Sequence, residues 1–335
     1  MALKHQGIHR LGYVRLALAD PRLLRAREFY CEQFGLLESR RGPGRLYLRC
    51  WHEPFAYSLV LEESADNRLL EIGFQVRDEA DLARLADQVE QAGVAVQRSA
   101  AGAELESLGA SIAFAIPGGP RLRLYADMAQ PGYVTGYDSP DWVTPRPLRG
   151  TPAPFFLNHV GFTAPDPQAA VDFLTRVLGF VVSERIDAAD GRLLSALLFR
   201  MSKEVGGQEL ALFPGPAGAL HHIAFTKEDP NDILVTGMYL REGGVDIDRY
   251  GPTRQSYGKT FSLHCRDPFG VRLELCAGGR VTEVHSQFQP VIWDEAELGK
   301  ALSWYDRDVQ EDFLAPSLAG TGRASADCVG QPPPR

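Results

Sequence analysis

Two histidines and one glutamate stand out because each lies inside a mainly apolar strand. His159 lies in the run from Leu157 to Phe162, His222 lies in the run from Leu220 to Phe225, and Glu274 follows a similar stretch. Burying a lone polar group in such a strand is costly, and the cost is removed if all three side chains bind one ion. Two imidazoles and a carboxylate leave coordination positions open, as in non-heme iron centres that activate oxygen. The pattern predicts a divalent metal site.

The first half of the chain repeats the same phrases with the ligand positions changed. Tyr13, Glu71 and Arg123 occupy the positions of the two histidines and the glutamate, in that order. An arginine cannot bind a metal ion and repels one. We therefore interpret the first half as a duplicated copy without a metal centre. The joint change of all three positions favours one metal site over three separately paired polar residues.

Composition limits the function classes. A chain of 335 residues with 44% hydrophobic and 23% charged residues is typical of a folded protein with two domains. The net charge is −8 and the basic residues form no run that follows phosphates, so nucleic acid is not an expected partner. The sequence has neither a bilayer-length apolar stretch nor a secretion signal, and its five cysteines lack CxxC spacing. We expect no membrane contact and a cytoplasmic location.

Four similar modules account for most of the chain. Each reads as an apolar strand, an amphipathic helix and then strands joined by tight turns, which predicts an α+β fold of four βαβββ modules in two pairs. Helices are expected at residues 22–34, 79–91 and 231–241, and from Pro167 to just before Gly179. Asp20 and Asp166 are the expected N-caps of the first and third helices.

Domain boundaries follow from the same pattern. We expect a module pair without metal at 1–135, a Pro- and Gly-rich linker at 136–155 and the metal-binding pair at 156–290. A closing segment is expected at 291–315. A tail at 316–335, rich in Ser, Ala, Gly and Pro, is expected to be disordered.

This organisation resembles the vicinal oxygen chelate superfamily, and within it the two-domain extradiol ring-cleavage dioxygenases, such as catechol and homoprotocatechuate 2,3-dioxygenases. The resemblance extends to about Phe313 and is carried by the two histidine strands, by Gly251 to Arg254 and by Asp267 to Glu274. It implies sheets that curl around a cavity, and Fe(II), or less favourably Mn(II), held by His159, His222 and Glu274. It also implies a catecholic substrate cleaved with O2 in aromatic catabolism, and a homo-oligomer, either a dimer or a tetramer.

The residues around the expected metal site depart from the family pattern. Relatives usually have a histidine on the strand before the second ligand, where this chain has Gln208, and another where it has Gln255. A glutamine donates hydrogen bonds but does not exchange protons near neutrality. His264 stands where relatives have a tyrosine. We expect His264 to be the main acid/base and the glutamines to orient oxygen or substrate; the alternative is a histidine paired only within its strand.

Four further residues are assigned to the substrate side. Arg200 lies where relatives contact substrate, although a surface cation explains it equally well. Arg254 and Tyr257 are expected at the pocket, with ordinary packing as the alternative for the tyrosine. Strand alternation directs His221 to the face opposite His222, so we expect a structural or outer role for it and not metal ligation.

The favoured function is an Fe(II)-dependent extradiol dioxygenase that opens a catecholic ring and incorporates both atoms of O2. Two alternatives use the same scaffold. One is a metal-dependent isomerase or lyase, to which the missing acid/base histidines lend weight; the other is a protein that binds small aromatic molecules without turnover.

Overall fold

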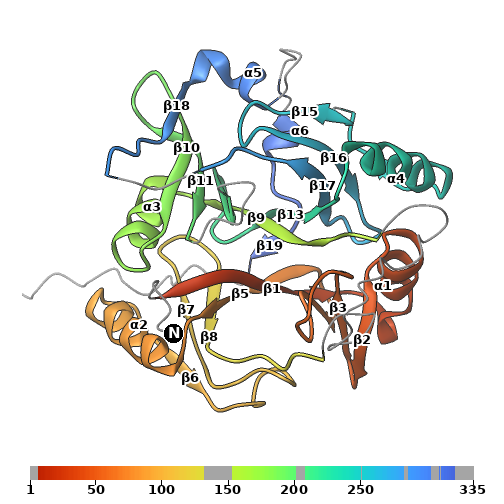
Figure 1. The fold of residues 1–335 in the computed structure, drawn as a ribbon, viewed down its shortest axis with the longest axis horizontal. Coiled ribbons are helices and arrows are strands. Elements are labelled where there is room, and N and C mark those ends of the chain that lie inside the picture. Colours follow the sequence, from red (N-terminus) through yellow and green to blue (C-terminus); the bar gives the residue numbers. More distant parts are fainter. Residues whose placement is uncertain are drawn as a thin grey trace, which may run out of the picture.

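Each half of the chain forms one twisted sheet, and the two sheets lie one above the other in the computed structural model (Figure 1). The structure describes residues 7–131, 153–200, 208–249, 251–282, 286–302, 309 and 311–320. The expected linker lies outside these ranges except for residues 153–155. The domain boundaries given above remain predictions.

The N-terminal sheet has the strand order β2-β3-β4-β1-β5-β8-β7-β6. Its two central strands, β1 and β5, open the first and second modules and pair antiparallel. The strands are β1 (Ile8–Leu18), β2 (Leu37–Gly42), β3 (Arg45–Arg49), β4 (Leu59–Glu63), β5 (Arg68–Val76), β6 (Gln97–Ser99), β7 (Ser111–Ala115) and β8 (Arg121–Tyr125), and the second helix is α2 (Glu79–Gln91).

The C-terminal sheet follows the same plan, with the order β14-β16-β17-β13-β9-β12-β11-β10-β18 and β15 paired to β16. Its strands are β9 (Phe156–Ala164), β10 (Val181–Asp187), β11 (Leu193–Phe199), β12 (Leu210–Pro214), β13 (Leu220–Thr226), β14 (Asp246–Ile247), β15 (Thr253–Arg254), β16 (Thr260–Arg266), β17 (Arg272–Gly278) and β18 (Val291–Asp294). Its helices are α3 (Pro167–Arg176), α4 (Pro230–Glu242), α5 (Leu298–Leu302) and α6 (Glu311–Leu314). The expectation of four βαβββ modules in two pairs is confirmed.

The N-cap expected for the third helix is confirmed, and the first helix differs from its expectation. The Asp166 carboxylate accepts a hydrogen bond from the backbone N–H of Ala169, as a side-chain N-cap does. In the first module Arg22 and Leu23 have left-handed φ angles of 60° and 53°. They divide the expected helix into a 3₁₀ turn (Pro21–Leu23), α1 (Leu24–Arg27) and a π-helical turn (Glu28–Gln33). The Asp20 carboxylate therefore accepts from Ala26 N–H, further along, at 2.8 Å.

The expected disordered tail does not begin at residue 316. Leu318 N–H and Ser317 N–H both donate to the carbonyl of Leu220, at 3.2 and 2.7 Å, and β19 (Ala319–Gly320) pairs in parallel with β5. The chain therefore returns to the junction of the two sheets (Figure 1). The composition of this segment does not prevent the pairing. A strand pairs through backbone groups, which every residue other than proline supplies in full.

One apolar core joins the two halves. Rings from opposite halves meet edge to face, with Phe34 5.4 Å from Phe225 and Phe74 5.4 Å from Phe180. At the edge of this core the Tyr30 hydroxyl donates to the Asp267 carboxylate at 2.8 Å. Asp267 also accepts from the backbone N–H groups of Phe269 and Val271, and so holds the turn that leads into β17.

Asp267 should make stability fall as pH rises. Burial raises the pKa of its carboxyl to about 6, with hydrogen bonds from Tyr30 and the backbone opposing the rise only in part. Because the ordinary value is near 4, the folded state binds the proton more tightly, and this contribution is full below about pH 4 and lost through pH 6. Relative to Asp267→Asn, the free energy of unfolding should drop by about 3 kcal/mol from pH 4 to 7 in urea titrations. Parallel curves for parent and variant would refute this; Asp87→Asn on the exposed face of α2 is the control.

Candidate metal centre

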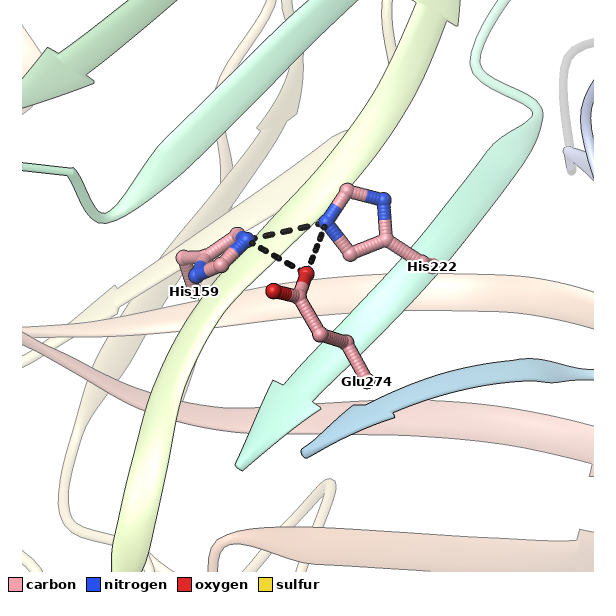
Figure 2. Close-up of side chains that lie close together, drawn as sticks. All are labelled: His159, His222 and Glu274. Carbon is pink, nitrogen blue, oxygen red and sulfur yellow. Dashed lines mark hydrogen bonds and ion pairs between the residues drawn. The ribbon is translucent and has the colours of Figure 1, made fainter. Parts of the chain in front are cut away.

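His159, His222 and Glu274 converge from three adjacent strands, β9, β13 and β17 (Figure 2). The two Nε2 atoms lie 2.9 Å apart, and Glu274 Oε2 lies 3.3 Å from the first and 3.4 Å from the second. The register explains the convergence, because Ala224 of β13 pairs with both His159 and Glu274. All three side chains are buried.

A glycine makes room for the second imidazole. Gly161 pairs with His222 across the β9–β13 ladder, and a Cβ at Gly161 would lie 2.4 Å from two atoms of the His222 ring. No real side chain tolerates that distance. The glycine of the sequence phrase from Leu157 to Phe162 therefore lets the ring lie across the strand and reach its two partners.

The donor atoms fit a divalent ion. The Glu274 Oε1 atom is buried and has no hydrogen-bond partner in the described part of the chain. His159 Nδ1 lies 2.7 Å from the side-chain oxygen of Asn158, so Nδ1 carries the proton and the Nε2 lone pair faces the other two residues. The same three residues form a group whose ligand atoms all lie within 4.8 Å of one another. Imidazole nitrogen and carboxylate oxygen suit iron or manganese.

Electrostatics hold Glu274 and His222 in their metal-binding forms. Burial raises the pKa of Glu274, but His264 and His159 outweigh it and hold that pKa well below its usual range. Burial lowers the pKa of His222 well below its ordinary value, and the neighbouring imidazole of His159 adds to the effect. A charged carboxylate facing a neutral imidazole is the state that ligates a metal ion.

Two residues expected beside the metal site do lie there. His264, on β16, pairs with Glu274 across the ladder, and its Nε2 lies 3.4 Å from Glu274 Oε2. The Gln208 amide lies 3.4 Å from His159 Nδ1, behind that ring. Both side chains are buried. The structure thus brings His264 and Gln208 to the centre, and their roles remain proposals.

Comparisons with known proteins agree with this geometry. Residues 156–275 match the Glyoxalase/Bleomycin resistance protein/Dioxygenase superfamily, and residues 71–129 match the catechol 2,3-dioxygenase-like N-terminal domain. Metapyrocatechase from Pseudomonas sp. (strain CF600) is 32% identical over 313 residues, covering 92% of this chain and 98% of that protein. The chain belongs to the extradiol ring-cleavage dioxygenases.

Other extradiol dioxygenases support the assignment. The manganese-dependent 2,3-dihydroxybiphenyl 1,2-dioxygenase of Geobacillus genomosp. 3 is 28% identical, over 90% of this chain and 95% of that protein. The crystal structure of the 2,3-dioxygenase LapB from Pseudomonas sp. KL28 matches with a TM-score of 0.77 and 27% identity, over 87% of this chain and 99% of LapB. Homoprotocatechuate 2,3-dioxygenase from Arthrobacter globiformis shares the fold, with a TM-score of 0.81 at 22% identity over 94% of this chain and 93% of that one.

In the first half of this extradiol dioxygenase an arginine takes the place of the ion. Glu71 lies opposite Arg15 on β1, as His222 lies opposite Gly161, and Arg123 pairs with Gly73 as Glu274 pairs with Ala224. The Tyr13 hydroxyl donates to Glu71 at 2.8 Å, and the Arg123 guanidinium donates to the same carboxylate at 3.0 and 3.1 Å. The positions predicted to correspond do converge, and a guanidinium supplies the positive charge there.

Arg123 should therefore matter for stability and not for metal binding. Arg123→Ala would leave the buried Glu71 carboxylate with Arg15, at 3.4 Å, as its nearest remaining cation. Removing one partner of a buried pair costs about 3 kcal/mol. We expect that loss in the free energy of unfolding from urea titration, with metal content by elemental analysis unchanged. A variant as stable as the parent, or one that loses metal, would contradict this account.

Three residues expected to contact or orient the substrate lie on β15 or in the turn that follows it. Tyr257 is buried, donates its hydroxyl to Ser195 Oγ at 3.0 Å and its N–H to the Ala301 carbonyl, and burial holds its pKa well above the usual value. Arg254 is exposed on β15, and Gln255 is half-buried in the following turn. The contacts of Tyr257 favour the packing alternative, and the roles of Arg254 and Gln255 remain predictions.

The contacts of Arg200 do not support its predicted role at the substrate. Its guanidinium lies beside both glycines, since a Cβ at Gly7 or at Gly179 would lie 3.4 Å from it, and its charge interacts with Asp81 and Arg84 of the N-terminal half. Burial lowers its pKa, and Glu209 opposes that shift. This placement belongs to the junction between the sheets, so we do not propose Arg200 as a substrate ligand.

His221 does not point away from His222 as strand alternation predicts. The β9–β13 register shifts between Leu220 and His222, which is a β-bulge with His221 as the extra residue. The bulge turns the ring so that its Nδ1 lies 2.7 Å from His222 Nδ1. The expectation of opposite faces is wrong for that reason, whereas the expected ligand, His222, keeps its place.

Two residues that sequence reasoning did not select complete the surroundings. Phe313 packs edge to face on His264 at 5.3 Å and on His221 at 5.9 Å. Arg272 is buried, two positions before Glu274 on β17. The signal for Arg272 was available, since residues two apart on a strand share a face. Phe313 carried no such signal, because it comes from a short helix far along the chain.

Proposed function

We propose that this protein is an Fe(II)-dependent extradiol dioxygenase that opens the ring of a catecholic substrate with O2. The convergence of three ligand atoms beside an unpartnered Glu274 oxygen carries the proposal, together with membership of the family. Mn(II) is the alternative ion, since the relative from Geobacillus is named as manganese-dependent and oxygen and imidazole ligands accept both metals.

The residues around the ion would have different roles in the reaction. A bound divalent ion supplies open positions for catecholate and dioxygen and a route for electrons between them. His264 is proposed to take a proton from the substrate hydroxyl and return it to the developing product, as a group 3.4 Å from the ligand Glu274 can. Gln208 is proposed to donate a hydrogen bond toward oxygen, with Gln255 assisting at the substrate. The Phe313 ring on His264 excludes water.

An apolar cavity suggests which substituents the ring carries. The cavity, of about 310 Å³, is bordered by Phe213, whose ring stacks on His221 at 4.3 Å, and by Leu314, next to Phe313. Glu295 is the only charged residue among the described residues that line it, and the rest are mostly Leu, Ile and Phe. Such a lining favours neutral apolar substituents and repels a carboxylate. We propose catechols with alkyl or aryl groups as substrates.

We also propose that the protein forms a homo-oligomer. Four apolar side chains are exposed on α4: Leu234, Val235, Met238 and Tyr239. A contiguous apolar face of this kind is typical of a protein contact surface. Light scattering after size exclusion tests the oligomeric state, and a monomer at all concentrations would refute the proposal.

Within the part of the chain that the structure describes, no helix is long and apolar enough to cross a membrane.

Oxygen uptake with a panel of catechols tests the function. The protein would be loaded anaerobically with Fe(II) or Mn(II) and offered alkyl-, aryl- and carboxyl-substituted catechols. We expect oxygen consumption with a yellow ring-opened product, fastest for the apolar substituents. Turnover without oxygen would favour an isomerase or lyase, and tight binding without turnover a binding protein. Faster cleavage of carboxylated catechols would refute the proposed substrate class alone.

A further inference from the structure

A clasp formed by the C-terminal residues Asp312–Gly320 lies against the strand that carries His222. Arg272 holds its first turn: one guanidinium nitrogen donates to the Asp312 carbonyl at 2.7 Å and the other to the Phe313 and Ala315 carbonyls, both at 3.0 Å. Leu220 then exchanges backbone hydrogen bonds with Leu318, at 2.9 and 3.2 Å. A buried guanidinium that serves three carbonyls fixes the clasp without any partner side chain.

His221 connects this clasp to the metal ligand through one rigid ring. Its Nδ1 lies 2.7 Å from His222 Nδ1 and its Nε2 lies 2.7 Å from the Phe313 carbonyl. A neutral imidazole carries one proton, so one of its nitrogens donates and the other accepts. The two contacts of His221 therefore depend on each other.

An ion on His222 would decide which nitrogen of His221 donates. If a metal ion binds His222 Nε2, the proton of the His222 ring must lie on Nδ1. The His222 Nδ1–H group then donates to His221 Nδ1. The His221 proton then lies on Nε2 and donates to the Phe313 carbonyl. In the other tautomer His221 Nδ1 donates to His222, and Nε2 accepts from the Arg272 guanidinium, 3.1 Å away. Only the first tautomer adds a hydrogen bond to the clasp.

We propose that His221 is a positioning residue that couples metal occupancy to the seating of the Asp312–Gly320 clasp. This inference rests on the proposed function in so far as it needs an ion at His159, His222 and Glu274. Metal binding selects the tautomer that holds the Phe313 carbonyl, and the seated clasp in turn strengthens metal binding, because coupling between two sites is reciprocal. The Phe313 ring, which covers His264 and His221, is thereby held in place when the ion is bound.

Hydrogen exchange on the full chain tests the coupling. Peptides covering residues 311–320 would be followed by mass spectrometry in metal-free protein and with saturating Mn(II) under anaerobic conditions. In the parent we expect Mn(II) to slow exchange there about fivefold to tenfold, the equivalent of one net hydrogen bond. In His221→Phe, which keeps a ring on Phe213, the ratio should fall to about one, and Mn(II) affinity should fall about 10-fold or more.

Arg272→Lys is the matched control. It loosens the clasp whether or not the ion is present, so exchange should rise in both states while the Mn(II) ratio persists. An equal ratio in His221→Phe and the parent would overturn the inference. A parent that takes up no ion overturns the proposed function as well, whereas a parent that binds Mn(II) without slower exchange at 311–320 overturns the coupling alone.

A second measurement does not depend on any variant folding. Histidine labelled with ¹⁵N, in protein loaded with diamagnetic Zn(II), reports by NMR which nitrogen of His221 carries the proton. We expect the proton on Nε2. A proton on Nδ1 in the loaded protein would overturn the inference.

Discussion

Glu274→Gln should yield a protein that retains no divalent ion and consumes no oxygen with any catechol. The substitution keeps the volume of the side chain but removes the only anionic ligand. The glutamine amide would also face the Nε2 atoms of His159 and His222, which lie 3.3 and 3.4 Å from Oε2 in the parent. Losing that charge removes several kcal/mol of stabilisation, so turnover should fall at least about 1000-fold. Elemental analysis of anaerobically loaded protein and an oxygen electrode measure both.

Glu71→Gln is the matched control for this experiment. Glu71 is the corresponding residue of the first half, equally buried, and it binds Arg123 where Glu274 faces the metal site. The same chemical change there should reduce stability and leave metal content intact. A Glu274→Gln protein that keeps a full equivalent of iron would exclude Glu274 as a ligand, and with it the site described above.

His264→Phe should lower turnover about 100-fold to 10,000-fold while the bound metal stays. The reason is geometric, because His264 Nε2 lies 3.4 Å from Glu274 Oε2. In the described part of the chain, the other histidine beside the three ligands is His221, and it already contacts the Phe313 carbonyl of the clasp. The phenyl ring keeps the packing against Phe313. Steady-state oxygen uptake and elemental analysis together separate a lost proton transfer from a lost ion.

His264→Tyr supplies the comparison for that variant. Tyrosine is the residue that the family resemblance predicts at this position, and its hydroxyl still donates a proton. We expect it to retain more activity than His264→Phe, with a pH optimum displaced upward because a phenol releases its proton at higher pH than an imidazole. Equal rates for the parent and the phenylalanine variant would remove His264 from the chemistry.

The metal site was predictable because its signal is local and repeated. Each of the three ligands lies in a mainly apolar strand, and the first half of the chain shows the same strands with all three positions changed. The cap of the third helix was predictable for a similar reason, since Asp166 and Ala169, whose N–H it accepts, are near neighbours in sequence. Strand pairing then had only to align three equivalent positions, which the duplicated module does by symmetry.

The orientation of His221, the contacts of Arg200 and the return of the chain at residues 316–320 were decided only by tertiary structure. Alternation predicts one face for His221, but a bulge depends on how two strands pair and not on either strand alone. Arg200 packs against the other half of the chain, and β19 adds to a strand some 250 residues earlier. These features depend on contacts between distant segments, whereas the ligand pattern depends on residue type and spacing, and for that reason the sequence alone determined the centre but not its enclosure.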